Sequence, residues 1–318
     1  MKQYCVGIDV GGTTVKCGVF TTEGKLLRKW EVPTRKEEGG KHILPDVAAS
    51  LREQLTRLLI PLEEIEGIGI GVPGPVEPSG YVRVCVNLGW TDRFPAEEMS
   101  GLMGGIPCQA GNDANVAALG ELWQGGGKGY DSLVMVTLGT GVGGGVILGK
   151  RILAGVHGAG GEIGHMPVNL EEQEVCNCGS RGCLEQYASA TGIVRVAKRR
   201  IARMQPGETT RMTDLGDALS AKDICDLAKA GDPLALDALA YSMRYLGLVL
   251  AHISETVDPE VFVIGGGVSK AGSFLTDMIG TYYAEFSHIL GTKAGIVPAS
   301  LGNDAGIYGS ARMVLNKD

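Results

Sequence analysis

The chain has 318 residues, 44% of them hydrophobic and 20% charged, which is typical of a globular protein and sufficient for two domains with separate cores. Its formal net charge of −7 argues against a general binder of nucleic acid or of an anionic membrane surface, because such partners require clustered Lys and Arg. Glycine is the unusual component, since 50 residues is about twice the usual share. The backbone must therefore turn sharply, or approach other groups closely, at many positions.

The N-terminal segment lacks the apolar core of a signal peptide, because Asp9 interrupts its first apolar run. We therefore expect a cytoplasmic protein. In that reducing compartment its eight cysteines are not expected to form a disulfide framework. Five of them are scattered among apolar residues and are interpreted as core residues: Cys5, Cys17, Cys85, Cys108 and Cys225.

Strand and helix patterns alternate along the chain, as they do in α/β domains. An apolar strand over residues 4–9 leads into the sequence GGTT, and a second strand follows at 15–20. The sequence IEGIGIGVPGP, residues 65–75, predicts a strand that runs into a rigid turn. Between them we expect a helix that Asp46 caps, that ends before Pro61, and that buries Val47, Leu51, Leu55, Leu58 and Leu59.

Residues 132–149 carry no charge and are long enough to raise a membrane span as an alternative. Six glycines and two threonines favour two strands joined by a tight turn. Further along, Asp232 and Pro233 predict the start of a long helix that Pro259 ends, followed by a strand and the turn GGG. The basic run at 198–203 is interpreted as a solvated helix face. Residues 203–220 match no pattern and are expected to form a surface connection.

Two segments share the plan of an apolar strand, a glycine and threonine turn, and a second apolar strand. They are GIDVGGTTVKCGVF at 7–20 and MVTLGTGVGGGVIL at 135–148. Backbone N–H groups in a glycine turn form an anion-binding concavity, and threonine hydroxyls add further donors. Two such phosphate loops, facing one ligand from two domains, would imply a nucleoside polyphosphate held in a cleft.

The second of these segments also contains two competing motifs. GTGVGG at 139–144 matches the dinucleotide fingerprint, and Glu162 follows about twenty residues on. That fingerprint requires a helix next, whereas residues 145–153 have the pattern of a strand. GGVILGK at 144–150 approaches a Walker A loop, but Arg151 stands where Ser or Thr must bind magnesium. Neither motif is therefore favoured.

The stretch CNCGSRGC, residues 176–183, places three cysteines within eight positions. Three sulfurs so close together cannot pair without leaving one over, and positions in a tight loop suit a shared ion better than a disulfide. A fourth ligand for such an ion must come from elsewhere in the chain.

Three motifs in order together resemble the ROK family of sugar kinases and related repressors: DVGGTTVK at 9–16, the block at 138–165, and CNCGSRGCLE at 176–185. The resemblance spans residues 4 to about 312. NDANVAALGE at 112–121 and SATGI at 189–193 are more similar to the bacterial glucokinases of this family than to its other branches.

The resemblance implies an α/β fold of two actin-like ATPase (ribonuclease H-like) domains hinged around a central cleft. Residues 1–112 with about 303–318 would form a small domain that holds the first phosphate loop. Residues 113–302 would form a larger one that holds the second phosphate loop, a zinc loop and an adenosine turn.

Members of this family hold a zinc ion with three cysteines and one histidine. The resemblance therefore implies a metal site of His165, Cys176, Cys178 and Cys183, a set that suits closed tetrahedral, structural zinc. The ion would fix the loop that carries Glu185. It would also orient His165, whose second ring nitrogen is then able to donate to a substrate.

Asp113 matches the catalytic base of the family, which takes the proton of a sugar hydroxyl as that oxygen bonds to phosphorus. The alternative is that Asp113 caps the helix that follows it. Gly74 is expected to offer its backbone to the sugar, with a plain turn as the alternative. Four further residues match the ligands of the sugar hydroxyls, and their paired acceptors suit vicinal hydroxyls: Asn112, Glu162, His165 and Glu185.

On the nucleotide side, Asp9 matches the acidic residue that holds Mg²⁺, through water. Lys16 either offsets the charge of the phosphates or is merely solvated. The glycine turn after the later strand matches the turn that passes the adenosine of ATP, with a plain strand-to-helix turn as the alternative. The residues of the three turns are Gly11, Gly12, Thr13 and Thr14 in the first phosphate loop, Thr140 and Gly141 in the second, and Gly265, Gly266 and Gly267 at the adenosine.

These matches imply ATP-dependent phosphorylation of glucose at its 6-hydroxyl, with Mg²⁺ as cofactor. N-acetylmannosamine, N-acetylglucosamine and fructose remain alternative substrates. A sugar-responsive repressor is a further alternative, but those repressors carry an additional N-terminal helix-turn-helix domain, which we do not expect before the strand at Tyr4. No nucleic-acid or membrane partner is expected, and a homodimer is expected by analogy with the family.

Overall fold

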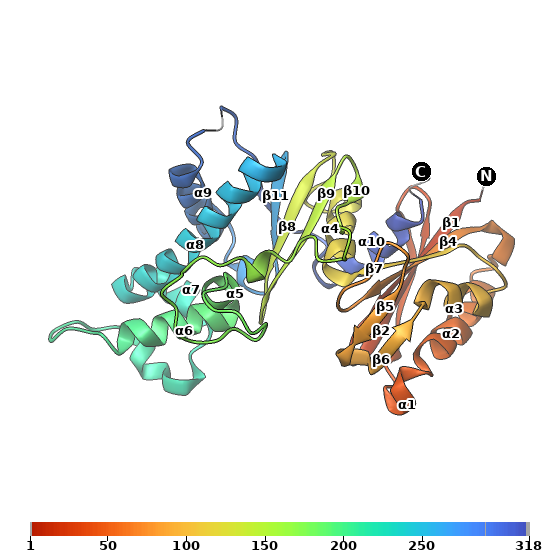
Figure 1. Ribbon diagram of the computed structural model, residues 1–318, viewed down its shortest axis with the longest axis horizontal. Helices are drawn as coiled ribbons and strands as arrows, with labels where there is room; N and C mark the ends of the chain where they lie inside the picture. The colour runs from red at the N-terminus through yellow and green to blue at the C-terminus, as the bar shows by residue number, and fades with distance from the viewer. Residues whose placement is uncertain (1, 290, 316–318) are drawn as a thin grey trace. The chain divides into compact units, whose positions relative to one another are not determined.

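The computed structural model describes residues 2–289 and 291–315 of the chain (Figure 1). By residue contacts the chain forms two compact units. The first runs to Leu133 and also contains Gly145–Gly161 and the chain from Ser300 onward. The second contains Val134–Gly144 and Glu162–Ala299.

A five-stranded sheet of order β3-β2-β1-β4-β7 is the framework of the first unit. β1 is antiparallel to β2 and parallel to β4, so the start of the chain forms the centre of the sheet. Asp9, near the end of β1, lies opposite Lys16 of β2 and Gly71 of β4. The strands are β1 (Tyr4–Val10), β2 (Thr14–Thr21), β3 (Leu26–Pro33), β4 (Ile65–Val72) and β7 (Cys108–Asn112).

Helices cover both faces of this sheet because the apolar side chains of β1 point alternately to either side. Val6 and Ile8 share a core with Leu51 of helix α2. Cys5, which directly precedes Val6 and points to the opposite face, packs instead against Ile307 of helix α10. The helices of this unit are α1 (Glu37–Gly40), α2 (Ile43–Arg57), α3 (Pro95–Leu102), α4 (Asp113–Gln124) and α10 (Ala305–Met313), and β5 (Val82–Cys85) pairs with β6 (Trp90–Arg93).

Much of the glycine excess serves close packing around α10. A Cβ on Gly7 of β1 would lie 1.8 Å from the carbonyl oxygen of Ile307, and one on Gly69 of β4 would lie 1.8 Å from that of Ser310. The contact between α10 and α4 is equally tight, since a Cβ on Gly309 would lie 1.6 Å from the carbonyl oxygen of Val116. Glycine is therefore required at these positions by space.

A second five-stranded sheet has the order β10-β9-β8-β11-β12. Its first strands confirm the predicted hairpin over residues 132–149 and exclude a membrane span there. Because a strand and no helix follows residues 139–144, the dinucleotide fingerprint does not apply. The strands are β8 (Leu133–Leu138), β9 (Val142–Leu148), β10 (Arg151–Ile152), β11 (Val261–Gly265) and β12 (Gly295–Pro298).

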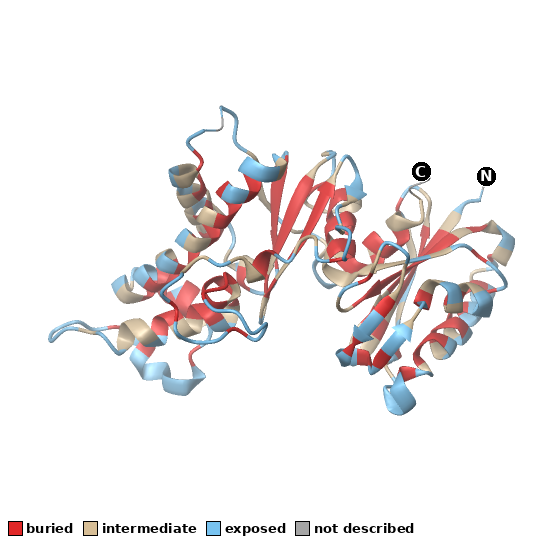
Figure 2. Cartoon of the chain, viewed as in Figure 1, coloured by how far each residue is buried: buried red, intermediate tan, exposed pale blue. Residues whose placement is uncertain are grey.

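The long helix α8 (Pro233–Val257) is the core element of the second unit. Asp232 caps it as predicted, accepting hydrogen bonds from the backbone N–H groups of Leu234 and Ala235. It is the one helix among the described residues that is long and apolar enough to cross a membrane, but it packs against its neighbours and has a buried face (Figure 2). Those neighbours are α5 (Glu185–Ala188), α6 (Ala190–Ile201), α7 (Ala221–Lys229) and α9 (Ser273–Phe286).

Two local predictions need correction. Helix α2 begins at Ile43, three residues before Asp46, because Pro45 is tolerated in a first helical turn. The side chain of Asp46 caps nothing and instead accepts two hydrogen bonds from Arg35 at 2.5 and 2.6 Å. Leu59 is not on the buried face, since it is 89% exposed in the turn after the helix, where its φ is +57°.

The compact units also differ from the domains expected from the resemblance. Helix α4 was expected to open the larger domain, but it packs on α10 and belongs to the first unit. Residues 145–161 also belong to the first unit, because their strand β10 contacts α4. The expected boundaries near residues 112 and 303 stay predictions.

All eight cysteines are free, and those expected in the core are buried, apart from the half-buried Cys108.

Candidate active site

The first glycine and threonine turn joins β1 to β2. The backbone N–H of Gly11 donates to the carbonyl oxygen of Thr14 at 3.1 Å, which closes the turn. Thr34 holds it from the side, because its hydroxyl donates to the carbonyl oxygen of Gly11 at 2.7 Å and its N–H to that of Thr13 at 2.9 Å. Gly12 is half-buried and Thr13 exposed at the tip. The turn is therefore held from outside while its tip stays accessible.

Asp9 precedes this turn and lies against the start of α10. A Cβ on Gly306 would come within 2.5 Å of its carboxylate, so glycine is needed there. Burial raises the pKa of Asp9 to about 6, an effect that Lys16 opposes and that the charge of Asp113 increases. Two carboxylates that repel each other in a site with little water suit a divalent cation, and Mg²⁺ takes one or two carboxylates together with substrate phosphates.

Lys16 donates its Nζ to the carbonyl oxygen of Asn303 at 3.0 Å, beside the entry to α10. Its role toward phosphate stays a prediction.

Gly74, Asn112 and Asp113 come together where β4 and β7 end. The side-chain amide of Asn112 donates to the carbonyl oxygen of Gly74 at 3.0 Å and to Oδ1 of Asp113 at 3.1 Å. Gly74 has a φ of +103°, which favours glycine. Asn112, and not Asp113, is the N-cap of α4, because its Oδ1 accepts from the N–H groups of Ala114 and Asn115, both at 3.1 Å.

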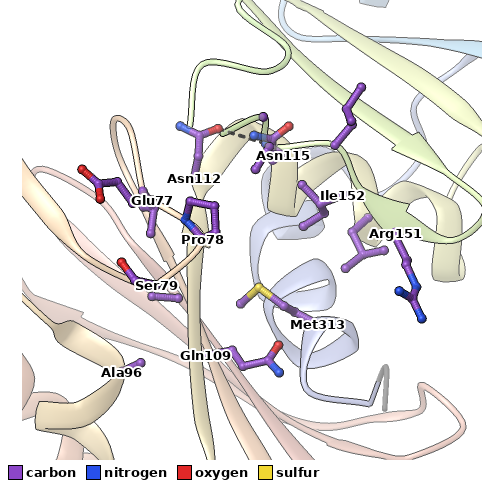
Figure 3. Close-up of a pocket in the computed structure, with 18 of the residues that line it drawn as sticks. Glu77, Pro78, Ser79, Ala96, Gln109, Asn112, Asn115, Arg151, Ile152 and Met313 are labelled. Carbon is purple, nitrogen blue, oxygen red and sulfur yellow. Dashed lines mark hydrogen bonds between the residues drawn. The ribbon is translucent and has the colours of Figure 1, made fainter. Parts of the chain in front are cut away.

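A cavity of about 580 Å³ lies beside β7 within the first unit (Figure 3). Asn112 and Asn115 form one end of it, Met313 lies lower down, and Ile152 and Arg151 lie on the side of β10. Asn115 is 3% exposed, and its Oδ1 has no hydrogen-bond partner among the described residues. The cavity thus places a buried acceptor next to a predicted sugar ligand.

In the second unit, the turn from β8 to β9 is held by the helices that follow the cysteines. Ala190 donates its N–H to the carbonyl oxygen of Gly139 at 2.8 Å, and the hydroxyl of Thr191 donates to that of Thr140 at 2.9 Å. A Cβ on Gly141 would lie 2.3 Å from the carboxylate of Glu185. Glycine is therefore required at this position of the predicted second phosphate loop.

The predicted adenosine turn packs on the end of β8. Gly266 has a φ of +85°, and a Cβ there would lie 2.4 Å from the carbonyl oxygen of Leu138. Gly139 directly follows Leu138. The turn of Gly265–Gly267 and the predicted second phosphate loop therefore lie side by side, as a shared nucleotide would require. Gly267 has open space at its Cβ position.

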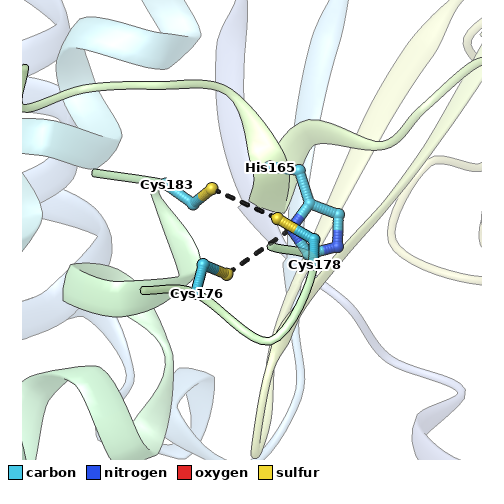
Figure 4. Close-up of side chains that lie close together, drawn as sticks. All are labelled: His165, Cys176, Cys178 and Cys183. Carbon is cyan, nitrogen blue, oxygen red and sulfur yellow. Dashed lines mark hydrogen bonds between the residues drawn. The ribbon is translucent and has the colours of Figure 1, made fainter. Parts of the chain in front are cut away.

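The three clustered cysteines meet His165 in the second unit (Figure 4). We call residues 175–184, which carry them, the cysteine loop. One ligand atom from each of the four residues lies within 4.8 Å of every other. Sγ of Cys178 is 3.6 Å from Sγ of Cys183, and Sγ of Cys176 is 3.9 Å from Nδ1 of His165.

These separations fit zinc. A tetrahedral ion with Zn–S bonds of about 2.3 Å separates its sulfur ligands by about 3.8 Å. The backbone N–H of Ser180 lowers the pKa of Cys178 to about 7, which favours the thiolate that a metal needs. Burial raises the pKa of Cys176, so this ligand needs the ion to lose its proton.

Three predicted sugar ligands surround this cluster. Nδ1 of His165 faces the sulfurs, while its Nε2 lies 4.0 Å from the carboxylate of Glu162. Glu185 directly follows the cysteine loop, and its Oε2 accepts the backbone N–H of Val142 at 3.1 Å. Sγ of Cys176 lies 3.9 Å from its Oε1. A metal that fixes the loop would therefore also fix Glu162, His165 and Glu185.

Two charged residues next to this cluster were not predicted from the sequence. Glu172 has a buried carboxylate, and Arg199 pairs with it at 2.8 Å. Arg199 belongs to the basic run interpreted as a solvated face, and its side chain is 34% exposed but also pairs with the buried Glu172. The two are 27 positions apart, so no local pattern connects them.

Comparisons with known proteins agree with the motifs. The ROK family pattern matches residues 5–317. The glucokinase of Halalkalibacterium halodurans is 40% identical over 318 residues, covering 99% of this chain and 96% of that protein. A ROK family glucokinase from Streptomyces griseus, solved with glucose and AMPPNP, is 33% identical with a TM-score of 0.73, and 98% of each chain is covered. The ROK hexokinase of Thermus thermophilus is 33% identical with a TM-score of 0.80, and 97% of each chain is covered.

Less similar relatives are named for another sugar or for repression. The N-acetyl-D-glucosamine kinase of Haemophilus influenzae is 28% identical, covering 98% of this chain and 99% of that protein. The xylose repressor of Bacillus subtilis is 28% identical, covering 98% of this chain and 77% of that protein.

Proposed function

The chain belongs to the ROK family and has its actin-like ATPase fold, and from this premise we infer that it phosphorylates glucose at the 6-hydroxyl with ATP. The observation that carries this inference is the 40% identity to a glucokinase over 99% of the chain. The relatives named for N-acetyl-D-glucosamine and for xylose repression are 27–30% identical. Glucose is therefore preferred over N-acetylglucosamine, and a kinase over a repressor.

Asp113 is the proposed general base. A sugar hydroxyl is a poor nucleophile until its proton is accepted as the bond to phosphorus forms. Oδ1 of Asp113 accepts hydrogen bonds from the N–H of Ala114 at 2.8 Å and from the amide of Asn112 at 3.1 Å. These two donors hold the carboxylate at the start of α4, so that it is oriented before the sugar arrives.

Five further residues are proposed to hold the sugar. Asn112 and the backbone of Gly74 belong to the first unit, and their mutual hydrogen bond fixes both. The others belong to the second unit and surround the cysteine loop: Glu162, His165 and Glu185. Carboxylates accept from hydroxyls, and the Nε2 of His165 donates when Nδ1 is engaged by a metal.

The phosphates of the nucleotide are proposed to contact the first and second phosphate loops, whose accessible tips offer N–H groups and threonine hydroxyls. The turn of Gly265–Gly267 is proposed to pass the adenosine. Mg²⁺ is proposed to be held by Asp9 through water, where it would neutralise charge on the phosphates. Zinc fits His165 and the three cysteines, and four protein ligands make it structural. A cytoplasmic, homodimeric protein without nucleic-acid or membrane partners stays our expectation.

A coupled assay with a panel of hexoses tests the function. With MgATP we expect kcat/KM to be highest for glucose, and the Asp113→Asn variant serves as the blank for contaminating kinases. A higher kcat/KM for fructose, N-acetylmannosamine or N-acetylglucosamine would overturn the glucose assignment and leave the kinase. No turnover of any hexose by folded, zinc-loaded protein would overturn the kinase itself.

A further inference from the structure

A cluster of ion pairs around one buried carboxylate lies beside the cysteine loop and involves helix α6 of the second unit. Glu172, whose side chain is 3% exposed, accepts hydrogen bonds from both terminal nitrogens of Arg199 at 2.8 and 3.0 Å. It also accepts the hydroxyl of Tyr187 at 2.6 Å. The Arg199 hydrogen bonds hold the pKa of Glu172 well below its usual range. The carboxylate is thus charged and fixed from several directions.

Glu174 and Arg195 complete the cluster. Arg195 donates to Glu174 at 2.9 Å and to Glu172 at 3.3 Å, and Arg199 donates to Glu174 at 2.6 Å. The two arginines are four positions apart and project from one face of α6. Two carboxylates and two guanidinium groups therefore alternate, and the segment before the cysteine loop is tied to this helix.

Gln186 connects the cluster to both ends of the cysteine loop. Its Nε2 donates to the carbonyl oxygen of Glu174 at 3.0 Å, before the loop, and its Oε1 accepts the N–H of Cys183 at 3.1 Å, near the loop's end. Arg195 donates to the carbonyl oxygen of Gln186 at 2.7 Å. The cluster therefore supports the backbone that carries Cys176 and Cys183 on two sides.

The same contacts reach the proposed sugar ligand Glu185. It stands between Leu184 of the loop and Gln186, and it begins the short helix α5 (Glu185–Ala188). Tyr187, which donates to Glu172, belongs to that helix and is buried. A shift of the cluster would therefore turn α5 and displace the carboxylate of Glu185 from the N–H of Val142, its partner at 3.1 Å.

We propose that Glu172 and Arg199 are positioning residues that hold Glu185 for the sugar and Cys176 and Cys183 for the metal. They touch no reacting atom and act through Gln186 and Tyr187. The proposal rests on the proposed function for its sugar, and on the geometry of the four metal ligands for its metal.

A purely stabilising role is the competing explanation. Buried ion pairs are weak evidence for stability, because the loss of hydration offsets much of their attraction. If the cluster positions these residues, a mutation in it should weaken the affinity for sugar and metal selectively. If it only stabilises the fold, the same mutation should change all binding constants together with the melting temperature. The two explanations therefore differ in what they predict for ATP.

The test replaces Arg199→Lys, which keeps the charge but loses the planar fork that holds the carboxylate with two bonds. We expect the KM for glucose and the rate of zinc release to a chromogenic chelator to rise about 10- to 100-fold, the usual effect of a residue that supports a metal ligand. The KM for MgATP should rise less than the KM for glucose, because Glu185 reaches the predicted second phosphate loop only through the N–H of Val142. Hydrogen exchange of residues 176–188 should accelerate without ligands present. Glu172→Gln, if it folds, should behave in the same way.

Asp217→Asn is the matched control, because it removes an exposed ion pair that Lys198 forms from the same helix. It should change none of these quantities. Unchanged zinc release and exchange in Arg199→Lys would overturn the proposal, and so would equal changes in the KM values for glucose and ATP. If the unmodified protein fails to phosphorylate glucose, the proposed function fails, while zinc release and exchange still decide the positioning role.

Discussion

At the start of α4, the neighbouring residues Asn112 and Asp113 have different roles. Asn112 satisfies the first N–H groups of the helix, as a cap does. Asp113 is the first residue of the helix itself. The capping role that the sequence left open for Asp113 therefore falls to Asn112. What remains for Asp113 is the proposed role of general base.

Asp113→Asn should lower kcat by about 10²- to 10⁴-fold, the usual contribution of a general base, because an amide accepts no proton at neutral pH. The melting temperature should hardly change, since Asn112 still caps the helix. The KM for glucose should change less than kcat, because the other sugar ligands remain. Steady-state kinetics and thermal melting of the purified variant measure these quantities.

The control is Asn112→Ala, which removes the cap and should cost about 1 kcal/mol of stability. A folded Asp113→Asn protein that keeps more than about a tenth of the normal kcat would contradict the base assignment, since general-base catalysis contributes more than that.

Asp9 predicts how nucleotide binding depends on pH. Its pKa of about 6 lies above the ordinary value of 3.8 for an aspartate because burial disfavours the charged form. Affinity for Mg²⁺ and a non-hydrolysable ATP analogue should therefore fall about tenfold per pH unit below 6, as this carboxylate takes up a proton. The folding stability of the nucleotide-free protein should instead gain a contribution from Asp9 as pH falls from about 6 toward 4. A raised carboxyl pKa means that the folded state binds the proton more tightly than the unfolded state does.

Titration calorimetry between pH 5 and 7.5 measures this affinity. In Asp113→Asn the acid limb should move to lower pH, because the charge of Asp113 is one cause of the raised pKa of Asp9. An affinity that does not vary across this range would rule out Asp9 as the group that titrates.

At residue scale, the sequence predicted what is local. The turn after Asp9 follows from neighbouring residues, and so does the presence of a cap at the start of α4, although Asn112 and not Asp113 provides it. Glu172 and Arg199 were not found because their partnership depends on how the cysteine loop folds back on α6. Nothing in an exposed acidic stretch and a basic helical run indicates which of the charges will be buried.

At the scale of elements, the contact of α4 with α10 depends on glycines in both helices. A Cβ on Gly120 would lie 2.2 Å from the carbonyl oxygen of Ala305, and one on Gly309 would lie 1.6 Å from that of Val116. Two helices whose backbones approach this closely cannot admit a methyl group without moving apart. The α10 helix also lies on β1 and β4, so the whole first unit would respond.

Gly309→Ala should therefore destabilise the first unit by about 1–3 kcal/mol, the usual cost of overpacking a close contact. Gly101→Ala in α3 is the matched control, because the Cβ position there is open. Alanine favours a helix over glycine by up to about 1 kcal/mol, so this control should be neutral or stabilising. Urea denaturation measures both. Equal stability of the two variants would contradict the packing argument.

The helices also show where sequence patterns lose precision. The 3.6-residue pattern gave α2 its buried residues Val47, Leu51 and Leu55. It misplaced the start, because Asp46 has the residue type of a cap while its side chain pairs with Arg35. A capping residue and a charged partner look alike until the neighbouring loop is placed, so helix ends are predicted less well than helix faces.

At the scale of the whole molecule, the tryptophans that report unfolding and the predicted zinc ligands belong to different units. All three tryptophans, Trp30, Trp90 and Trp123, belong to the first unit. All four predicted zinc ligands belong to the second. The resemblance placed the domain boundary before α4, whereas contacts with α10, distant in sequence, keep α4 in the first unit.

Loss of zinc should therefore destabilise one unit and not the other. Cys178→Ser is the suitable change, because Cys178 is exposed and its replacement leaves no cavity in the core. We expect zinc content to fall and the melting transition seen by far-ultraviolet circular dichroism to include an earlier phase, since binding to the native site stabilises only the folded state. The tryptophan fluorescence transition should keep its midpoint.

Gly309→Ala should instead destabilise the first unit and not the second, because its packing defect lies in the first unit. There the fluorescence midpoint should fall, while the later phase of the dichroism transition and the zinc content should not change. A fluorescence midpoint that follows zinc loss as closely as dichroism does would show that the units unfold as one cooperative body, and the unit-specific effect would then be wrong. Zinc content equal to that of the unmodified protein in Cys178→Ser would instead remove Cys178 from the ligand set, since three ligands hold structural zinc far more weakly than four.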